Sequence, residues 1–303
     1  MMNKDLNVDA KTTPPAPLTL FVEAVAFWSP LLPDWSRARK AFRGEGDALE
    51  VPARRPSPVL LPPAERRRAP DSVALALEVA AAAVAESQIP PGELLSVFTS
   101  CHGDLGITDA MCTTLVENPQ LVSPTRFHNA VHNAASGYWG IATGCTRAST
   151  AVSAFEHSFA AGLLEAATQA VVEDRAVLLV GYDIEARGAL ATTTASRGLL
   201  AVALVLAPHR GPRSIAVLEC ALTAAPAADS APESAPFAPL SRSAAARSLA
   251  ENAMADALPL FEALADVDIA AERAAGHGAE ATSLSLPLSA TLALHVKLGD
   301  IAL

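Results

Sequence analysis

The chain has 303 residues, of which 51% are hydrophobic and 18% are charged, and its formal net charge is -10. A chain of this length can bury a large core. Its few charged residues would barely cover the surface of a monomer, so it has either a buried subunit interface or an alanine-rich composition set by its genome. The negative charge argues against nucleic-acid binding, which needs a basic face to neutralise phosphates.

The cysteines and the N-terminus bear on the cellular compartment. Four cysteines are present and no two of them form a Cys-x-x-Cys pair, which predicts reduced thiols in a cytoplasmic protein rather than a zinc ribbon or a disulfide framework. Residues 1–17 are polar and contain prolines, which predicts a flexible tail and no signal peptide. We expect no membrane span, because no apolar run reaches about 18 residues.

Strands and helices are expected to alternate along the chain, which predicts an α/β fold with a central sheet. The expected strands are residues 18–28, 94–100, 175–182, 199–207 and 213–221, with strand-like alternation over 281–298. The expected helices are residues 71–89, 108–117, 129–142, 153–172 and 251–264, and residues 30–70 are expected to form a loop rich in proline and arginine.

The composition divides the chain into four segments. Residues 1–17 are the tail, and residues 18–222 hold most of the predicted strands and helices. Residues 223–245 are rich in alanine, proline and serine without periodicity, which predicts a linker. Residues 246–303 form a final helix and strand segment.

An ordered series of motifs lies between about residue 60 and residue 207. Its members are residues 61–68, 99–104 (TSCHGD), 123–127 (SPTRF), 131–137 (VHNAASG), 160–166 (AAGLLEA) and 177–183 (VLLVGYD). This series resembles the N-terminal half of thiolase-fold β-ketoacyl synthases, and more closely the short chain length factors of aryl-polyene pathways. The resemblance implies a layered α/β thiolase-like fold, with a mixed sheet between helices and a short extra C-terminal segment.

The family's nucleophile is missing from the matching position. Active synthases carry a cysteine in Thr-Ala-Cys-Ser-Ser at a helix N-terminus, where free N–H groups lower the thiol pKa and hold an oxyanion. Residues 150–154 read Thr-Ala-Val-Ser-Ala, so Val152 takes the place of the cysteine. The family's two C-terminal histidines also lack counterparts, since His277-Gly278 is not followed by Thr-Gly-Thr. The resemblance therefore implies a pseudo-enzyme and no catalytic residues.

By resemblance, the chain pairs with an active β-ketoacyl synthase as a heterodimer. It would close the acyl tunnel and set chain length in polyene, polyketide or fatty-acid-like biosynthesis. No cofactor is expected on the chain itself, because the phosphopantetheine of an acyl carrier protein would be bound by the partner complex. The tunnel or interface candidates are Trp139, Val152, Phe155 and Phe159.

Two further groups of residues have more than one interpretation. The basic run Arg66, Arg67 and Arg68 suits docking of an acidic acyl carrier protein, a solvated surface, or pairing with acidic residues of a partner. His132 and Asn133 are expected to bond backbone groups beneath the former active site. His128 and His132, four residues apart, suggest a metal site together with His102, but no cysteine or carboxylate completes the ligand set and no metal is expected.

Two other functions stay open. The chain could stabilise a partner synthase without controlling product length. It could also be a stand-alone acyltransferase that uses Cys145, or Ser153 with His157 four residues later. Against these roles, Ser153 is also suited to capping a helix and Cys145 to being a buried spectator thiol.

Overall fold

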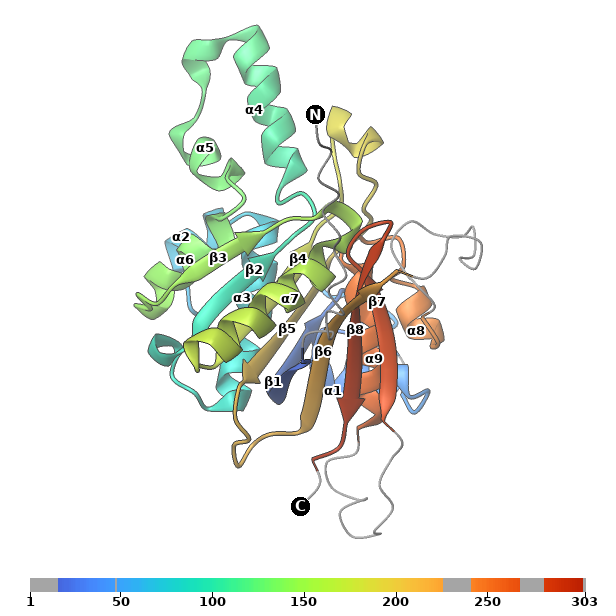
Figure 1. Cartoon of the computed structure of the whole chain (residues 1–303). Coiled ribbons are helices and arrows are strands. Elements are labelled where there is room, and N and C mark those ends of the chain that lie inside the picture. Colours follow the sequence, from blue (N-terminus) through green and yellow to red (C-terminus); the bar gives the residue numbers. More distant parts are fainter. Residues whose placement is uncertain (1–15, 47, 226–240, 268–280, 302–303) are drawn as a thin grey trace, which may run out of the picture.

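The computed structural model describes residues 16–46, 48–225, 241–267 and 281–301. Its centre is an eight-stranded sheet with the order β3-β2-β4-β5-β1-β6-β8-β7 (Figure 1). The strands are β1 Leu18–Trp28, β2 Leu95–Thr99, β3 Ser149–Val152, β4 Val177–Asp183, β5 Leu200–Ala207, β6 Ala216–Ala224, β7 Thr282–Pro287 and β8 Leu292–Gly299. β2 pairs in parallel with β3 and β4, and the other pairs are antiparallel, so the predicted α/β class with a mixed sheet is confirmed.

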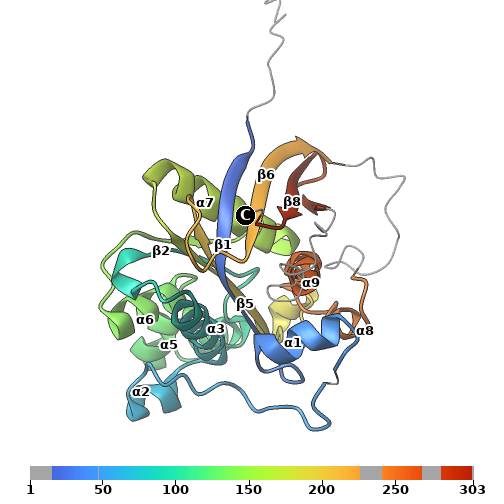
Figure 2. The same ribbon diagram turned by 90° about the horizontal axis from the view of Figure 1, so that it is seen from below.

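Helices cover both faces of the sheet. The α-helices are α1 Trp35–Phe42, α2 Pro63–Arg68, α3 Asp71–Ser87, α4 Leu105–Glu117, α5 Pro124–Ala130, α6 Ala134–Thr143, α7 Ser158–Glu173, α8 Ala244–Arg247 and α9 Leu258–Asp266. One apolar core lies between the sheet and α7, α9 and α1, and a second lies between the sheet and α3 and α6 (Figure 2). β4 is buried throughout, as expected for a strand with helices on both faces. None of the described helices is both long and apolar enough to cross a bilayer.

Several local predictions differ from the structure, and the expected helix 251–264 begins only at Leu258, as α9. The expected loop 30–70 contains α1, whose N-terminus is capped by Asp34 accepting from Arg37 N at 2.8 Å, and α2. The expected helix 129–142 is split into α5 and α6, because Val131 is extended. The expected helix 153–172 begins only at Ser158, because residues 153 and 154 turn away from β3 and residues 155–157 form a short 3₁₀ helix.

The C-terminal segment is built into the same sheet and core. β6 runs to Ala224, beyond the predicted boundary at residue 222, and pairs with β8 from Val217↔Gly299 to Ala224↔Leu292. The segment also approaches β4 closely, since a Cβ atom on Gly181 would lie 2.8 Å from Met254 Sδ. Most of the predicted tail and most of the predicted linker lie outside the described residues.

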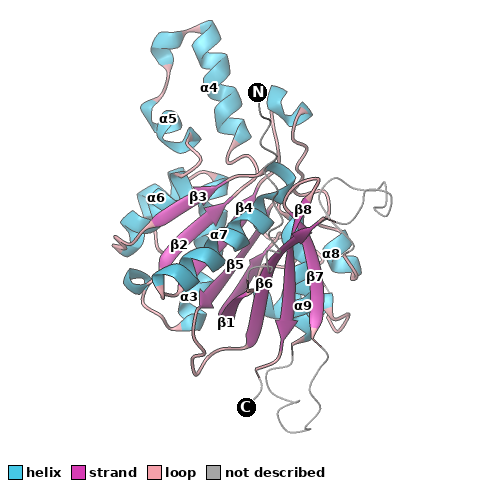
Figure 3. Ribbon diagram, viewed as in Figure 1, coloured by secondary structure: helices cyan, strands magenta, loops and turns pink. Residues whose placement is uncertain are grey.

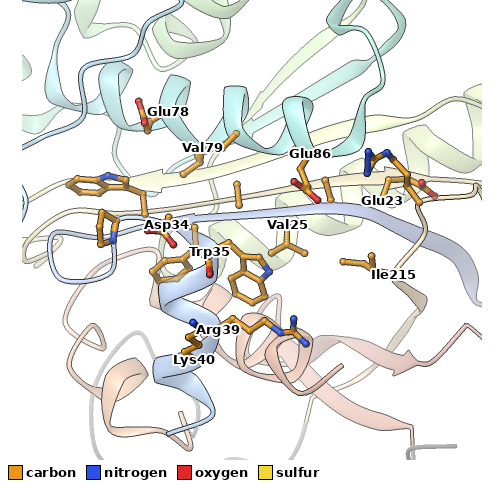
Figure 4. A pocket seen from close by; sticks show the side chains of 18 of the residues that line it. Glu23, Val25, Asp34, Trp35, Arg39, Lys40, Glu78, Val79, Glu86 and Ile215 are labelled. Atoms are coloured by element: carbon orange, nitrogen blue, oxygen red, sulfur yellow. The ribbon is translucent and has the colours of Figure 1, made fainter. Parts of the chain in front are cut away.

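Two further features of the fold are a projecting arm and a groove beside β1. Helices α4 and α5 project beyond the sheet as an arm (Figure 3). A groove of about 740 Å³ lies between α1, α3 and β1, with Trp35 and Arg39 on one wall and Glu78 and Glu86 on the other (Figure 4). No residue singled out from the sequence lines this groove.

Candidate functional site

Polar groups gather where the parallel strands end. β2, β3 and β4 run in the same direction, so their carboxyl ends meet at one edge of the sheet. Ser100 follows β2, Ser153 follows β3, and Asp183 ends β4. Ligands of α/β proteins bind at this edge of a sheet, and a hollow of about 560 Å³ borders it through Asp104 and Ile184. We take this edge as the candidate site.

Asp183 is the centre of a buried hydrogen-bond network. Its side chain is fully buried, with Oδ1 accepting from Ser100 Oγ at 2.7 Å and Oδ2 accepting from Cys101 N at 2.9 Å. Ser100 Oγ in turn accepts from Gly103 N at 2.8 Å. Burial raises the pKa of Asp183 to about 7, although the donors from Cys101 and Ser100 act to lower it. The carboxyl group therefore titrates near neutral pH.

Two histidines flank this network. His132 Nε2 lies 2.9 Å from the carbonyl oxygen of Ser100, the kind of backbone bond expected for it, whereas the Asn133 side chain makes no capping bond to α6. The His102 imidazole is only 5% exposed, and its Nε2 lies 3.8 Å from Asp183 Oδ1. Neither ring nitrogen of His102 has a hydrogen-bond partner among the described residues. Burial lowers the pKa of His102, which favours the neutral ring.

The turn from β3 to α7 differs from the sequence expectation. Val152 pairs with Thr99 inside β3, so it lies in a strand and not at a helix N-terminus. The turn continues through Ser153 and Ala154 into the short 3₁₀ helix η3, Phe155–His157. Phe155 has φ 50° and a side chain that is 71% exposed. The sequence did not predict this turn, because residues 153–172 were expected to form one continuous helix.

The N-terminus of α7 receives a carboxyl group from the C-terminal segment. Oδ2 of Asp256, in the 3₁₀ helix η6 Ala255–Ala257, accepts from Phe159 N at 2.9 Å and from Ala160 N at 3.4 Å. Burial raises the pKa of Asp256 well above its ordinary value. These N–H groups at the start of α7 are therefore already bonded to a group of the chain itself. Asn252 joins the same region by donating to the carbonyl oxygen of Asp183 at 3.3 Å.

The tunnel or interface candidates lie in different environments. Phe159 is fully buried, with its ring centroid 6.1 Å from that of Phe261, and Trp139 is 2% exposed in the core on the other side of the sheet. Val152 is half-buried at the edge of the first core. Phe155 is the exposed member of the four.

The basic run lies on α2. Arg66 donates from Nε and Nη2 to the carbonyl oxygen of Leu61, at 3.2 and 2.9 Å. Arg67 and Arg68 are exposed. Arg66 therefore stabilises the preceding loop, whereas Arg67 and Arg68 face solvent.

Among the described residues, neither Ser153 nor Cys145, the two alternative nucleophiles, forms a hydrogen bond with a basic side chain. Ser153 Oγ donates to the carbonyl oxygen of Cys101 at 2.8 Å, and among the described residues no hydrogen bond joins Ser153 to His157. Cys145 Sγ lies 3.7 Å from the carbonyl oxygen of Leu94, at the amino end of β2 and so at the opposite edge of the sheet. Burial, with smaller effects of Asp183, Asp256 and Glu156, raises the pKa of Cys101 to about 12, so its thiol stays protonated.

Sequence reasoning missed the acidic residues of the site. Asp183 carries a recognisable signal, because it is an acidic residue at the end of an otherwise apolar strand. Asp256 and Asn252 carry none, because their place depends on how the C-terminal segment packs. Within the described part of the chain, no three His, Cys, Asp or Glu side chains form a group suited to a metal ion.

Comparison with known proteins identifies the family. Residues 35–260 match the family model for the N-terminal domain of β-ketoacyl synthases. The match covers most of the chain, and the chain belongs to this family. A search among curated proteins returned no match.

Solved structures with the same layered, thiolase-like fold include ketosynthase complexes. The ketosynthase ApeO in complex with its chain length factor ApeC from Xenorhabdus doucetiae gives a TM-score of 0.65 at 20% identity, covering 92% of this chain and 99% of the other. The ishigamide ketosynthase/chain length factor gives 0.70 at 16% identity, covering 94% and 100%. AntDE:AntF, an acyl-carrier protein in complex with its ketosynthase, gives 0.67 at 11% identity, covering 94% and 100%. At these identities the likeness establishes the fold.

Proposed function

We propose that this chain is a catalytically inactive synthase homologue that pairs with an active β-ketoacyl synthase in the cytoplasm and limits the length of the acyl chain. The observation that carries the proposal is the turn after β3. The turn exposes the aromatic ring of Phe155. Its hydroxyl group, on Ser153, donates to the carbonyl oxygen of Cys101, and Asp256 accepts from the N–H groups at the start of α7. A nucleophile and an open oxyanion site are the two parts that acyl transfer requires.

The edge strand and the arm support the pairing. β3 is the outermost strand of the sheet, so one of its edges has no neighbour among the described strands. Large apolar side chains are exposed on the arm and on the nearby helix α6: Leu115, Val116, Leu121, Phe127 and Ile141. Clustered exposed apolar side chains and open strand edges are typical of subunit interfaces. In the similar complexes a ketosynthase is bound to a chain length factor, which supports the same arrangement here.

The isolated chain is expected to form no carbon–carbon bond between malonyl-acyl carrier protein and an acyl primer. It is also expected to form no adduct with an acyl-thioester analogue, measured by intact-protein mass spectrometry. Co-expressed with its synthase, it should elute with that subunit in one peak, and the pair should condense. An active synthase alone is the positive control for labelling. Condensation by the isolated chain would refute the proposal, and an adduct on Ser153 or Cys145 would favour the acyltransferase alternative.

Arg67 and Arg68 are proposed to steer the acyl carrier protein that delivers phosphopantetheine-bound substrate to the complex. Exchanging both for glutamate should lower the association rate with the carrier by about tenfold at low salt, because long-range attraction sets such rates. Surface plasmon resonance at two ionic strengths measures the effect, which should shrink as salt rises. Arg175→Glu, an exposed charge reversal just after α7, is the matched control. Equal rates for both variants would assign Arg67 and Arg68 to ordinary solvated surface.

A further inference from the structure

One edge of β1 loses its neighbouring strand partway along. On the β5 side, β1 is paired to its last residue, Trp28. On the other side, β6 pairs only as far as Val22, whose carbonyl oxygen accepts from Ile215 N at 2.8 Å. The register with β5 also shifts between Val22 and Ala24, an irregularity that bends a strand away from its neighbour. Among the described strands, none pairs with residues 23–28 on the β6 side.

This open edge of β1 carries unpaired backbone groups. In an antiparallel pair, alternate residues direct their N–H and C=O groups away from the partner strand. No backbone hydrogen bond from another described residue reaches residues 23–28 on the side away from β5. All six of these residues line the groove of about 740 Å³. An unpaired strand edge is a template for another strand.

The two walls of the groove carry opposite charges. The α3 wall presents Glu78 and Glu86, which lie about two turns apart on one face of the helix. The α1 wall presents the half-buried ring of Trp35 together with Arg39 and Lys40 (Figure 4). The groove therefore has an acidic wall and a basic wall on either side of β1.

The carboxyl groups of the acidic wall have no cation beside them. Glu78 is half-buried, and burial raises its pKa. No hydrogen bond or ion pair joins Glu78 or Glu86 to another described residue. Arg39 points elsewhere, because it donates to the carbonyl oxygens of Ala265 and Val267 at 3.2 and 2.7 Å. A bound cation would recover the free energy that partial burial costs the Glu78 carboxylate.

The two helices lie on opposite faces of the sheet, which determines the side chains that an added strand would need. Ala24 and Ala26 pack in the core beneath α3. Val25 and Phe27 pack in the core that contains α1. Side chains alternate between the two faces along any strand. A strand beside β1 would therefore direct one set of side chains toward the acidic wall and the other set toward the basic wall.

We propose that an extended segment of a partner protein binds in this groove as an added strand beside residues 23–28, with lysine or arginine facing α3 and acidic residues facing α1. Main-chain hydrogen bonds to the open edge supply affinity, and the two walls select the alternating charges. The groove has the volume of a cleft for a small ligand, so it holds a short segment and not a folded domain. The inference is independent of the proposed function, because no residue of the candidate site lines the groove.

The first test uses the full chain and synthetic peptides of about six residues, the length of the open edge. One peptide alternates lysine and glutamate, and its control has the same composition with the two residue types in separate blocks. Isothermal titration calorimetry should show saturable binding of the alternating peptide, about tenfold tighter than the block peptide, because only the alternating order places all cations on one face. The alternating peptide with methylated backbone nitrogens should not bind, because it has lost its donors to β1.

The second test removes the charges of the acidic wall. Replacing Glu78 and Glu86 together by glutamine should weaken binding of the alternating peptide by about tenfold at low salt. Replacing Glu117 and Glu173, two exposed carboxylates on α4 and α7, is the matched double control and should leave the affinity unchanged. Hydrogen exchange followed by mass spectrometry should show slower exchange of the residue 23–28 amides when the peptide is bound.

Three results would overturn the inference. The first is no saturable binding, or equal affinity for the alternating and block peptides. The second is an equal loss of affinity in the two double variants, because the effect would then come from net charge and not from the groove. The third is a dimer, seen by sedimentation, whose formation protects the amides of residues 23–28, because the open edge would then belong to a second copy of the chain.

Discussion

Replacing Phe261 with alanine is expected to lower the free energy of unfolding by about 3–5 kcal/mol. The side chain is fully buried on α9, and its ring centroid lies 6.1 Å from that of Phe27, 5.9 Å from that of Trp35 and 6.1 Å from that of Phe159. The substitution removes a large apolar surface from this cluster and leaves a cavity. Denaturant unfolding followed by tryptophan fluorescence measures the loss.

The same experiment tests whether the C-terminal segment and the N-terminal part form one cooperative unit. Because Phe27 and Trp35 belong to β1 and α1, both parts should unfold in a single transition at a lower denaturant concentration. Leu292→Ala, a partly exposed position on β8, is the control and should cost less than about 1 kcal/mol. Two separate transitions, with the first alone shifted by Phe261→Ala, would show that α9 docks as an independent element.

Replacing Asp183 with asparagine is expected to remove a pH dependence from the stability of the fold. Burial raises the pKa of Asp183 from 3.8 to about 7, so between these values the folded chain holds a proton that the unfolded chain has lost. The stability contributed by this proton is fully present below the unfolded pKa. It is lost as the pH rises through about 7, by up to about 4 kcal/mol. Unfolding curves between pH 4 and pH 8 measure it.

A comparison with this variant is needed because a second buried group, His102, changes the stability with pH in the opposite direction. Burial lowers the pKa of His102, which reduces stability as the pH falls below the ordinary histidine value of 6.5. The difference between wild type and Asp183→Asn should grow toward low pH, because the carboxyl group of the wild type holds its extra proton there. Asp266→Asn, on an exposed carboxylate paired with Arg242, should leave the wild-type pH profile unchanged. A pH-independent difference for Asp183→Asn would show that the carboxyl titrates as it does in the unfolded chain.

Much of the sheet could be predicted from the sequence, because its central strands are long apolar runs between prolines, glycines and charged residues. β1 has the predicted bounds, and β4 and β5 lie within one or two residues of theirs. β3 was missed because its four residues show too little alternation to separate a strand from an alanine-rich helix. The break at Val131 was missed for another reason, since a bond from His132 to the distant Ser100 carbonyl accompanies it.

The candidate site was predictable only in part. The motifs around residues 99–104 and 131–137 do meet at the carboxyl edge of the sheet, and their family is the one the sequence indicated. The position of Val152 was wrong as a helix N-terminus, because Val152 is the last residue of β3 and α7 begins only at Ser158. Asp256 lies 97 residues from its partner Phe159, and no local pattern encodes a contact of that separation.

The bond between Asp256 and the start of α7 also sets when the protein can assemble during synthesis. Residue 256 must emerge from the ribosome before the Asp256 carboxyl group can cap the N-terminus of α7. Residues 292–299 must emerge before β8 can pair with β6. Until then, the nascent chain carries an unfinished sheet and uncovered aromatic rings, the surfaces that chaperones bind.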